Sequence, residues 1–157
     1  MTLGLVCMVL VILVDQLSKY AILDWYLVEQ NGVFICNFFN IVRAWNPGVS
    51  FSMLNGYGSS GVYVLSGVAL AIVGVLFCWL KCERVKLTQI ALGLIMGGAL
   101  GNVIDRLRYG AVFDFLDFHI GSTHWPAFNV ADSCICIGAA IIVLQAVMAQ
   151  FKHKKEK

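Results

Sequence analysis

The hydrophobic and polar positions of this sequence form long apolar segments that are separated by stretches of mixed character. The apolar segments run from about residue 3 to 23, from 61 to 80, from 87 to 104 and from 131 to 151. Each has roughly 20 mainly apolar residues, the length at which an α-helix crosses about 30 Å of hydrocarbon. The pattern therefore predicts four transmembrane helices in a single domain that covers residues 1–157.

The stretch between the first two predicted helices, residues 24–60, has a different pattern. Its centre, VFICNFFNIVRAW, is rich in β-branched and aromatic residues, which favour strands. Turn signals flank it, with Asn-Gly at 31–32, Asn-Pro-Gly at 46–48 and Asn-Gly at 55–56. The predicted fold class is an all-α membrane protein with a small extracytoplasmic β-rich lobe between helices 1 and 2, whose aromatic rings suit the lipid headgroup layer.

The composition also indicates an integral membrane protein. Hydrophobic residues make up 60% of the chain and charged residues 13%, whereas ordinary globular domains carry about 25% charge. The formal net charge is only +2 and no long basic face is present, so nucleic acid is not an expected partner. The first apolar segment lacks a basic leading region and contains Asp15 and Lys19, so we expect a retained membrane helix and not a cleaved signal peptide.

The cysteines do not suggest a metal site. Cys7, Cys78, Cys134 and Cys136 lie inside apolar segments, where a cysteine behaves as a small hydrophobic residue. Their spacings match neither a CxxC pair nor the second half of a zinc site. We therefore expect neither a metal nor another cofactor.

Basic residues indicate the orientation in the membrane. They gather in the loop between the second and third predicted helices and in the C-terminal tail: Lys81, Arg84, Lys86, Lys152, Lys154, Lys155 and Lys157. A four-helix topology puts both regions on one side, and the positive-inside rule makes that side cytoplasmic. Both termini are then cytoplasmic, and the β-rich lobe lies on the extracytoplasmic side.

Four aspartates lie between the third and fourth predicted helices or at their ends: Asp105, Asp114, Asp117 and Asp132. Carboxylates beside a bilayer are costly, and two that share a site can hold one proton and act as base and acid in one turnover. Arg106 follows Asp105 directly, which favours a structural ion pair between them. Asp114 and Asp117 both lie among aromatic residues, which raise a carboxyl pKa, so context alone does not choose between them.

Asp132 has two compatible interpretations. Asn129 and Asp132 are spaced as an N-cap and an N3 residue of the fourth helix, where the helix dipole favours a carboxylate. A position in the first turn of a helix also lowers the pKa of a carboxyl group, whereas the aromatic surroundings of Asp114 raise it. Two carboxyl groups whose pKa values are pushed apart in this way are typical of a catalytic base and acid. Asp15 and Lys19 are one helical turn apart and can pair, which leaves a structural and a functional role equally open.

Four sequence blocks carry a resemblance to a known family. DQLSK, NPGVSF, GGALGNVIDR running into GAVFDF, and PAFNVADS occur in an order that resembles lipoprotein signal peptidase, also called signal peptidase II. The resemblance spans nearly the whole chain. It implies a four-helix aspartyl endopeptidase of the bacterial inner membrane, which cuts a prolipoprotein just before its diacylglyceryl-modified cysteine, with the active site near the extracytoplasmic face.

The resemblance also implies roles for individual residues. The aspartates of GAVFDF and FNVAD, Asp114 and Asp132, match the catalytic pair, which selects Asp114 over Asp117. Positions that line or shape the site match Asn46, Asn102, Arg106, Asn129, Asp15 and Lys19. The block NPGVSF departs from the family, whose members more often have alanine or another small residue at the positions of Val49 and Ser50. This difference affects the expected substrate-facing loop and not the catalytic pair.

Other functions make different demands on the sequence. A proton or cation transporter needs polar residues along several helices, and the second and fourth predicted helices have almost none. A metal-dependent protease would use His119 and His124 with the aspartates, but no HExxH is present, and we expect both histidines in a solvated loop. The membrane lipid and a lipidated substrate are the expected partners, and a monomer suffices for the chemistry.

Overall fold

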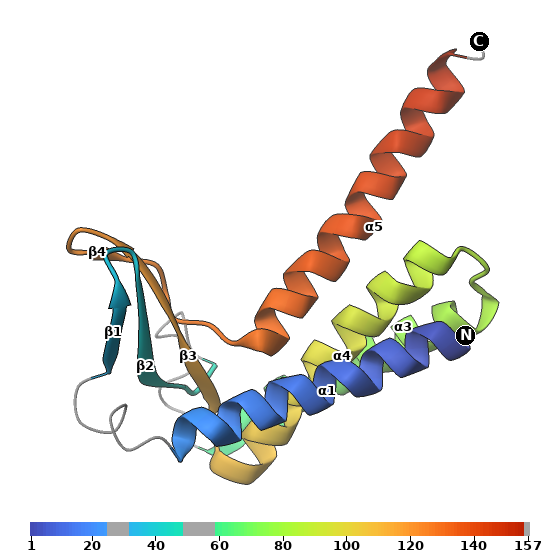
Figure 1. Ribbon diagram of the computed structural model, residues 1–157. Helices are drawn as coiled ribbons and strands as arrows, with labels where there is room; N and C mark the ends of the chain where they lie inside the picture. Colours follow the sequence, from blue (N-terminus) through green and yellow to red (C-terminus); the bar gives the residue numbers. More distant parts are fainter. Residues whose placement is uncertain (25–31, 49–58, 156–157) are drawn as a thin grey trace.

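The computed structural model describes residues 1–24, 32–48 and 59–155 (Figure 1). The helices are α1 (Thr2–Leu23), α3 (Ser59–Cys82), α4 (Lys86–Tyr109) and α5 (Val130–Lys155). The strands are β1 (Val33–Cys36), β2 (Phe39–Asn46), β3 (Val112–Ile120) and β4 (Thr123–His124). Within the described residues, four helices are long and apolar enough to cross a membrane, as the hydrophobic pattern predicted.

Helix α4 is longer than its apolar segment predicted. It continues past residue 104 through a charged turn and ends at Tyr109, because Gly110 adopts the left-handed conformation with φ 74° and donates its N–H to the Arg106 carbonyl. Glycine has no Cβ and takes this conformation readily, which makes it a common helix terminator. The extra turn brings Asp105 and Arg106 into the helix and directs the chain toward β3.

Helix α4 is the central helix of the bundle and packs against α1, α3 and α5. In its membrane-spanning segment 67% of the residues are buried, against 17% for α1 and 6% each for α3 and α5. Glycines permit this packing, since a Cβ at Gly97 would lie 2.7 Å from the Met8 carbonyl oxygen of α1. The outer helices therefore expose their apolar side chains, as expected of surfaces that face lipid.

The sheet is antiparallel, with the strand order β1-β2-β3-β4. It lies at the end of the bundle opposite the N-terminus (Figure 1). Strands β2 and β3 pair with Trp45 opposite Phe113 and Asn40 opposite Asp117, and an irregularity of β2 separates these pairs. Two segments that α3 and α4 separate in sequence thus form one sheet.

The predicted lobe of residues 24–60 accounts for only part of this sheet. It contains β1 and β2, but β3 and β4 come from the segment between α4 and α5, which we did not predict as strand. The first residues of β3, Val112–Phe115, are buried on both faces, so the segment lacks the alternation of apolar and polar residues that identifies a half-exposed strand. The turn signal at 46–48 is confirmed, since Gly48 has φ 86° and donates its N–H to Asn46 Oδ1 at 2.9 Å. Residues 25–31 and 49–58 of the predicted lobe, which include the Asn55-Gly56 turn signal and the positions of Val49 and Ser50, lie outside the described residues.

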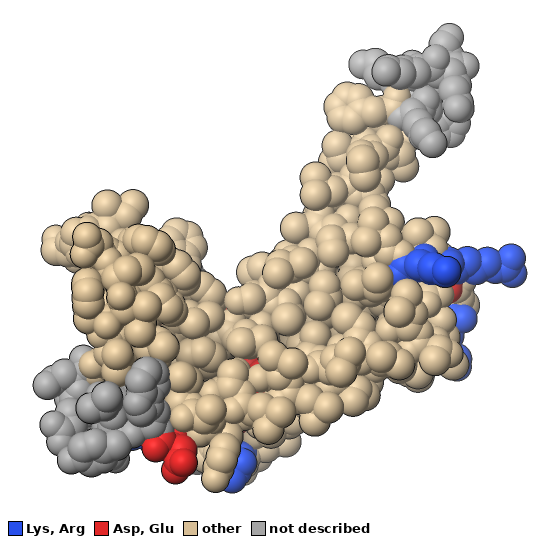
Figure 2. All heavy atoms as spheres, in the orientation of Figure 1, with Lys and Arg blue, Asp and Glu red and all other residues tan. Residues whose placement is uncertain are grey.

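Charge is unevenly distributed over the surface. Figure 2 shows most Lys and Arg side chains of this face at the end of the bundle where α3 joins α4, with one further basic group beside an acidic group at the opposite end, while the sides of the helices are almost free of charge. The exposed Lys81, Arg84 and Lys86 belong to this junction. The sheet and the basic junction therefore lie at opposite ends of the helices.

The close contact between α4 and α5 gives a stability prediction. A Cβ at Gly98 would overlap the Ala131 carbonyl oxygen of α5, so Gly98→Ala must push the two backbones apart. We expect a loss of about 1–3 kcal/mol in the free energy of unfolding, as for other overpacked sites. Thermal unfolding of the purified protein in detergent measures it.

The control is Gly74→Ala in α3, where a Cβ would meet nothing within 4 Å. This substitution should leave stability unchanged or raise it slightly, because alanine has the higher helix propensity. Equal midpoints for the two variants would show that Gly98 is not needed for the packing of α4 on α5.

Candidate functional site

Strand pairing positions Asp114. The chain leaves α4 at Gly110 and enters β3 at Val112, where pairing with β2 places Asp114 opposite Ala44. The Asp114 side chain is buried, with 2% of the residue exposed. Asp117 lies three residues further along β3, and because side chains alternate between the faces of a strand, the two aspartates point to opposite faces.

Local capping of α5 positions Asp132. Asn129 Oδ1 accepts the Asp132 backbone N–H at 2.9 Å, and Asp132 Oδ2 accepts the Asn129 backbone N–H at 3.3 Å. These reciprocal bonds form a capping box and confirm the capping interpretation drawn from their spacing. They also fix the Asp132 carboxylate in the first turn of the helix, where it stays half-buried.

Two asparagine side chains join Asp114 to Asp132. Asn129 Nδ2 lies 2.7 Å from Asp114 Oδ1 and 3.2 Å from Asn102 Oδ1, and Asn102 Nδ2 donates to Asp132 Oδ1 at 2.8 Å. Both amides are buried. The fold thus brings β3, α4 and the start of α5 together around two carboxylates.

The electrostatic environment of Asp114 favours a shared proton. The pKa of Asp114 is raised from its ordinary value of 3.8 to about 6, first by burial and next by the negative charge of Asp132. Hydrogen bonds from Asn46 and Asn129 and the positive charge of Lys19 oppose this rise. The two carboxylates therefore repel each other when both are ionised, which is the condition under which a pair retains a proton.

Arg106 faces the same carboxylates. Its positive charge interacts with Asp132 first, and then with Asp114 and Asp105. We expected Asp105 to form an ion pair with Arg106. In the structure Asp105 pairs with Lys19 of α1 instead, and Asp105 Oδ2 lies 2.8 Å from Lys19 Nζ. Sequence adjacency was misleading here, since neighbouring residues on a helix point about 100° apart.

A buried charged cluster lies between α1 and α4. Lys19 Nζ lies 2.9 Å from Asp15 Oδ2, which confirms the predicted pairing of these residues, and it also reaches Asp105. Gln16 Nε2 lies within hydrogen-bond distance of both carboxylates. We did not predict a role for Gln16, although its place beside Asp15 in DQLSK was a usable signal.

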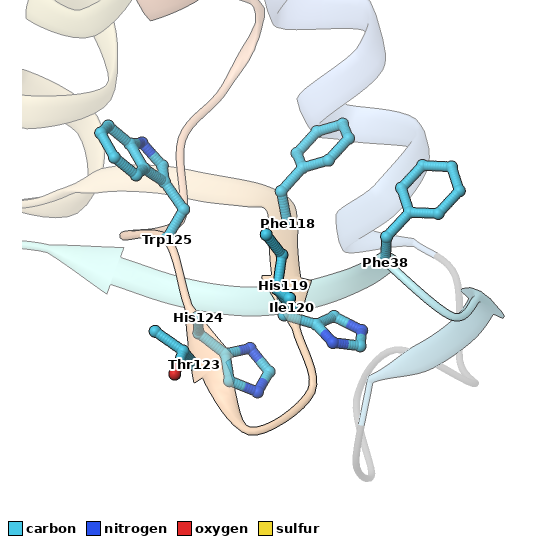
Figure 3. A pocket seen from close by; sticks show the side chains of 7 residues that line it. All are labelled: Phe38, Phe118, His119, Ile120, Thr123, His124 and Trp125. Carbon is cyan, nitrogen blue, oxygen red and sulfur yellow. The ribbon is translucent and has the colours of Figure 1, made fainter.

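Asp117 belongs to a separate group at the far end of β3. Burial acts to raise the pKa of Asp117, but hydrogen bonds from Asn40 and His124 and the nearby histidine charges lower it below its ordinary value. His119 and His124 lie in β3 and β4 with their rings stacked, and not in a loop as we expected. They border a pocket of roughly 450 Å³ that Phe38, Phe118, Ile120 and Trp125 also line (Figure 3). None of the residues joined around Asp114 and Asp132 lines this pocket.

Comparisons with known proteins agree on one family. The family model described as signal peptidase (SPase) II matches residues 7–148. The chain is 43% identical to a lipoprotein signal peptidase of Anaplasma marginale over 153 residues, which cover 95% of this chain and 86% of that protein. It is 48% identical to a lipoprotein signal peptidase of Paraburkholderia phymatum over 137 residues, which cover 86% and 81% of the two chains.

A solved structure has the same fold. It is described as a bacterial membrane enzyme determined by the in meso method at 2.3 Å resolution. The two structures superpose with a TM-score of 0.80 and 30% sequence identity over 98% of this chain and 92% of the other.

The raised pKa of Asp114 predicts a stability change with a definite sign. Because its folded-state pKa lies above the ordinary value of 3.8, ionisation costs stability, and this cost grows as the pH rises from about 4 to above 6. A shift from 3.8 to about 6 corresponds to ~3 kcal/mol. Asp114→Asn removes the charge, so we expect it to raise the free energy of unfolding at about pH 8 and to change it little near pH 4.

Asp117→Asn is the matched control with the opposite sign. The fold lowers the pKa of Asp117, so the ionised form stabilises the protein and its loss should destabilise it at about pH 8. Denaturation of both variants across this pH range, followed by tryptophan fluorescence, makes the comparison. If Asp114→Asn is as destabilising as Asp117→Asn at high pH, the strained-carboxylate description of Asp114 is wrong.

Proposed function

This chain belongs to the signal peptidase II family, and from that premise we propose that it is a membrane-embedded aspartyl endopeptidase. Its substrate is a bacterial prolipoprotein, which it cleaves before the diacylglyceryl-modified cysteine. Asp114 and Asp132 are the catalytic pair. The observation that carries this proposal is the pair of asparagine bridges, through Asn102 and Asn129, that hold the two carboxylates at one site.

The proposed chemistry needs one water molecule and one shared proton. The Asp132 carboxylate takes a proton from the water, whose oxygen attacks the scissile carbonyl carbon. Asp114, with its raised pKa, gives its proton to the carbonyl oxygen. The tetrahedral intermediate then collapses, the C–N bond breaks, and the amine leaves with a proton from the dyad. No acyl-enzyme forms.

The remaining polar groups orient the dyad and the substrate. Asn102 donates a side-chain N–H to Asp132 and Asn129 donates one to Asp114, which orients the two carboxylates. Asn46 is hydrogen-bonded to Asp114 and lies at the end of β2, where a bound peptide can reach it. Arg106 supplies positive charge next to both aspartates and stabilises the oxyanion as it forms.

The proposed location is the bacterial inner membrane, with both termini cytoplasmic and the site near the extracytoplasmic face. The basic junction of α3 and α4 lies opposite the sheet, which fits the positive-inside rule. Asp114 follows α4 along the chain and Asp132 lies in the first turn of α5, and the amides of Asn102 and Asn129 join the two aspartates. The lipid tails of the substrate can then stay in the bilayer while its peptide reaches the dyad, and a monomer is sufficient.

Separate neutral substitutions test the dyad. In a cleavage assay on a lipidated precursor peptide, Asp114→Asn and Asp132→Asn should each lower kcat at least about a thousandfold, because each removes one partner of an acid and base pair. The purified variants must first show a cooperative thermal unfolding transition in detergent, which establishes that they are folded.

Asp117→Asn is the control, because Asp117 is hydrogen-bonded to Asn40 and His124, away from the dyad. It should keep kcat within about threefold of the unmodified protein. Near-normal turnover of Asp114→Asn or Asp132→Asn would remove that residue from the mechanism.

A further inference from the structure

Two buried carboxylates beneath the proposed dyad each hold a backbone N–H next to a catalytic aspartate. Asp15 Oδ1 accepts the Ala131 N–H at 2.9 Å, one residue before Asp132. Asp105 Oδ2 accepts the Phe113 N–H at 3.1 Å, one residue before Asp114. The first bond links α1 to the start of α5, and the second links the end of α4 to β3. The same kind of contact thus fixes both chain segments that carry the dyad.

Lys19 joins the two carboxylates. Its ammonium group lies 2.9 Å from Asp15 Oδ2, 2.8 Å from Asp105 Oδ2 and 3.3 Å from Asn102 Oδ1. An ammonium group has three hydrogens, so all three are used. The contact with Asn102 turns the oxygen of that amide toward Lys19 and its nitrogen toward Asp132.

Gln16 forms the second link between the same carboxylates. Its Nε2 lies 3.1 Å from Asp15 Oδ2, 2.9 Å from Asp105 Oδ1 and 3.3 Å from the Gly101 carbonyl oxygen. Gly101 must be small at this place, because a Cβ there would lie 2.6 Å from Asp15 Oδ2. Each carboxylate is therefore held by Lys19, by Gln16 and by one backbone N–H.

We propose that Gln16 and Asp105 are positioning residues that set the distance between the Asp114 and Asp132 carboxylates. They do so from below the site: Asp105 holds β3 through the Phe113 N–H, and Gln16 ties Asp105 to Asp15, which holds the start of α5. This inference rests on the proposed function, since it assigns a purpose to the spacing of the dyad. Neither residue touches the reacting atoms.

The proposal explains why so many polar groups lie between α1 and α4. A single carboxylate would suffice to neutralise Lys19, and the burial of a second one, Asp105, carries a desolvation cost. The second carboxylate is accounted for if both segments that carry the dyad, the strand β3 and the start of helix α5, need an anchor. A displacement of about 1 Å in a catalytic group can lower the rate about a hundredfold, so a rigid anchor has a large effect on turnover.

The test uses Gln16→Met in the full-length protein, which keeps the length of the side chain and removes the link between the carboxylates. Gln145→Met is the matched control, because Gln145 contacts Thr88 and lies far along α5 from the dyad. We expect Gln16→Met to lower kcat about tenfold to a hundredfold with KM within about twofold, and Gln145→Met to change neither.

The pH profile separates positioning from mere stability. A wider dyad weakens the repulsion from Asp132 that helps to raise the pKa of Asp114. The alkaline limb of kcat/KM should therefore move to lower pH in Gln16→Met. Asp105→Asn keeps the size of the side chain and weakens its bond to Lys19, so its alkaline limb should also move to lower pH. It replaces Gln16→Met as the test variant if Gln16→Met does not fold.

Two results would overturn the proposal. One is an unchanged kcat and pH profile in both folded variants. The other is a loss of activity that is proportional to the loss of folded protein, while the folded fraction keeps the pH profile of the unmodified protein. Asp114→Asn and Asp132→Asn are measured in the same assay: if they stay active, the proposed function itself fails, whereas inactive dyad variants beside a normal Gln16→Met reject only the positioning role.

Discussion

The structure depends on the need to satisfy charges that are buried between two membrane helices. Asp15, Lys19 and Asp105 are 0%, 3% and 1% exposed, and a buried charge without partners is strongly destabilising. Their mutual contacts, together with Gln16, hold α1 against α4. Asp15 Oδ1 accepts the Ala131 N–H of α5, and Asp105 Oδ2, which also contacts Lys19, accepts the Phe113 N–H of β3. One polar cluster therefore joins the bundle to the sheet and to the last helix.

The proposed active site uses this rigidity for two carboxylates in unlike surroundings. Asp114 lies in a buried strand, where ionisation is unfavourable, and Asp132 lies half-buried in the first turn of a helix. Such a difference separates an acid from a base of the same residue type. The buried amides of Asn102 and Asn129 reach both carboxylates, so the pair is held together although its members repel. Ionisation of Asp114 lowers the free energy of unfolding, and such a loss of stability is common where a residue is placed for function.

Small residues of α4 make the arrangement possible. Gly97 and Gly98 bring α1 and α5 to backbone contact with α4, and Gly101 leaves space for the Asp15 carboxylate. The remaining helix surfaces are apolar and exposed, as a lipid environment requires. The polar site is thus confined to one end of the bundle, beneath the sheet, while the basic residues of the α3–α4 junction lie at the other end.

The sequence by itself determined the features that depend on neighbours along the chain. Hydropathy determined the four helices, and short spacings determined the Asp15–Lys19 pair and the capping box of Asn129 and Asp132, because residues three or four apart meet on a helix. The tertiary structure alone decided that Asp105 pairs with Lys19 and not with Arg106, that Gln16 links two carboxylates, and that β3 completes the sheet of β1 and β2. It also turned Asp114 and Asp117 to opposite faces of β3, a distinction that the family motif had made without a physical reason. These contacts join residues that are far apart in sequence, and helix packing and strand register, which no local pattern encodes, bring them together.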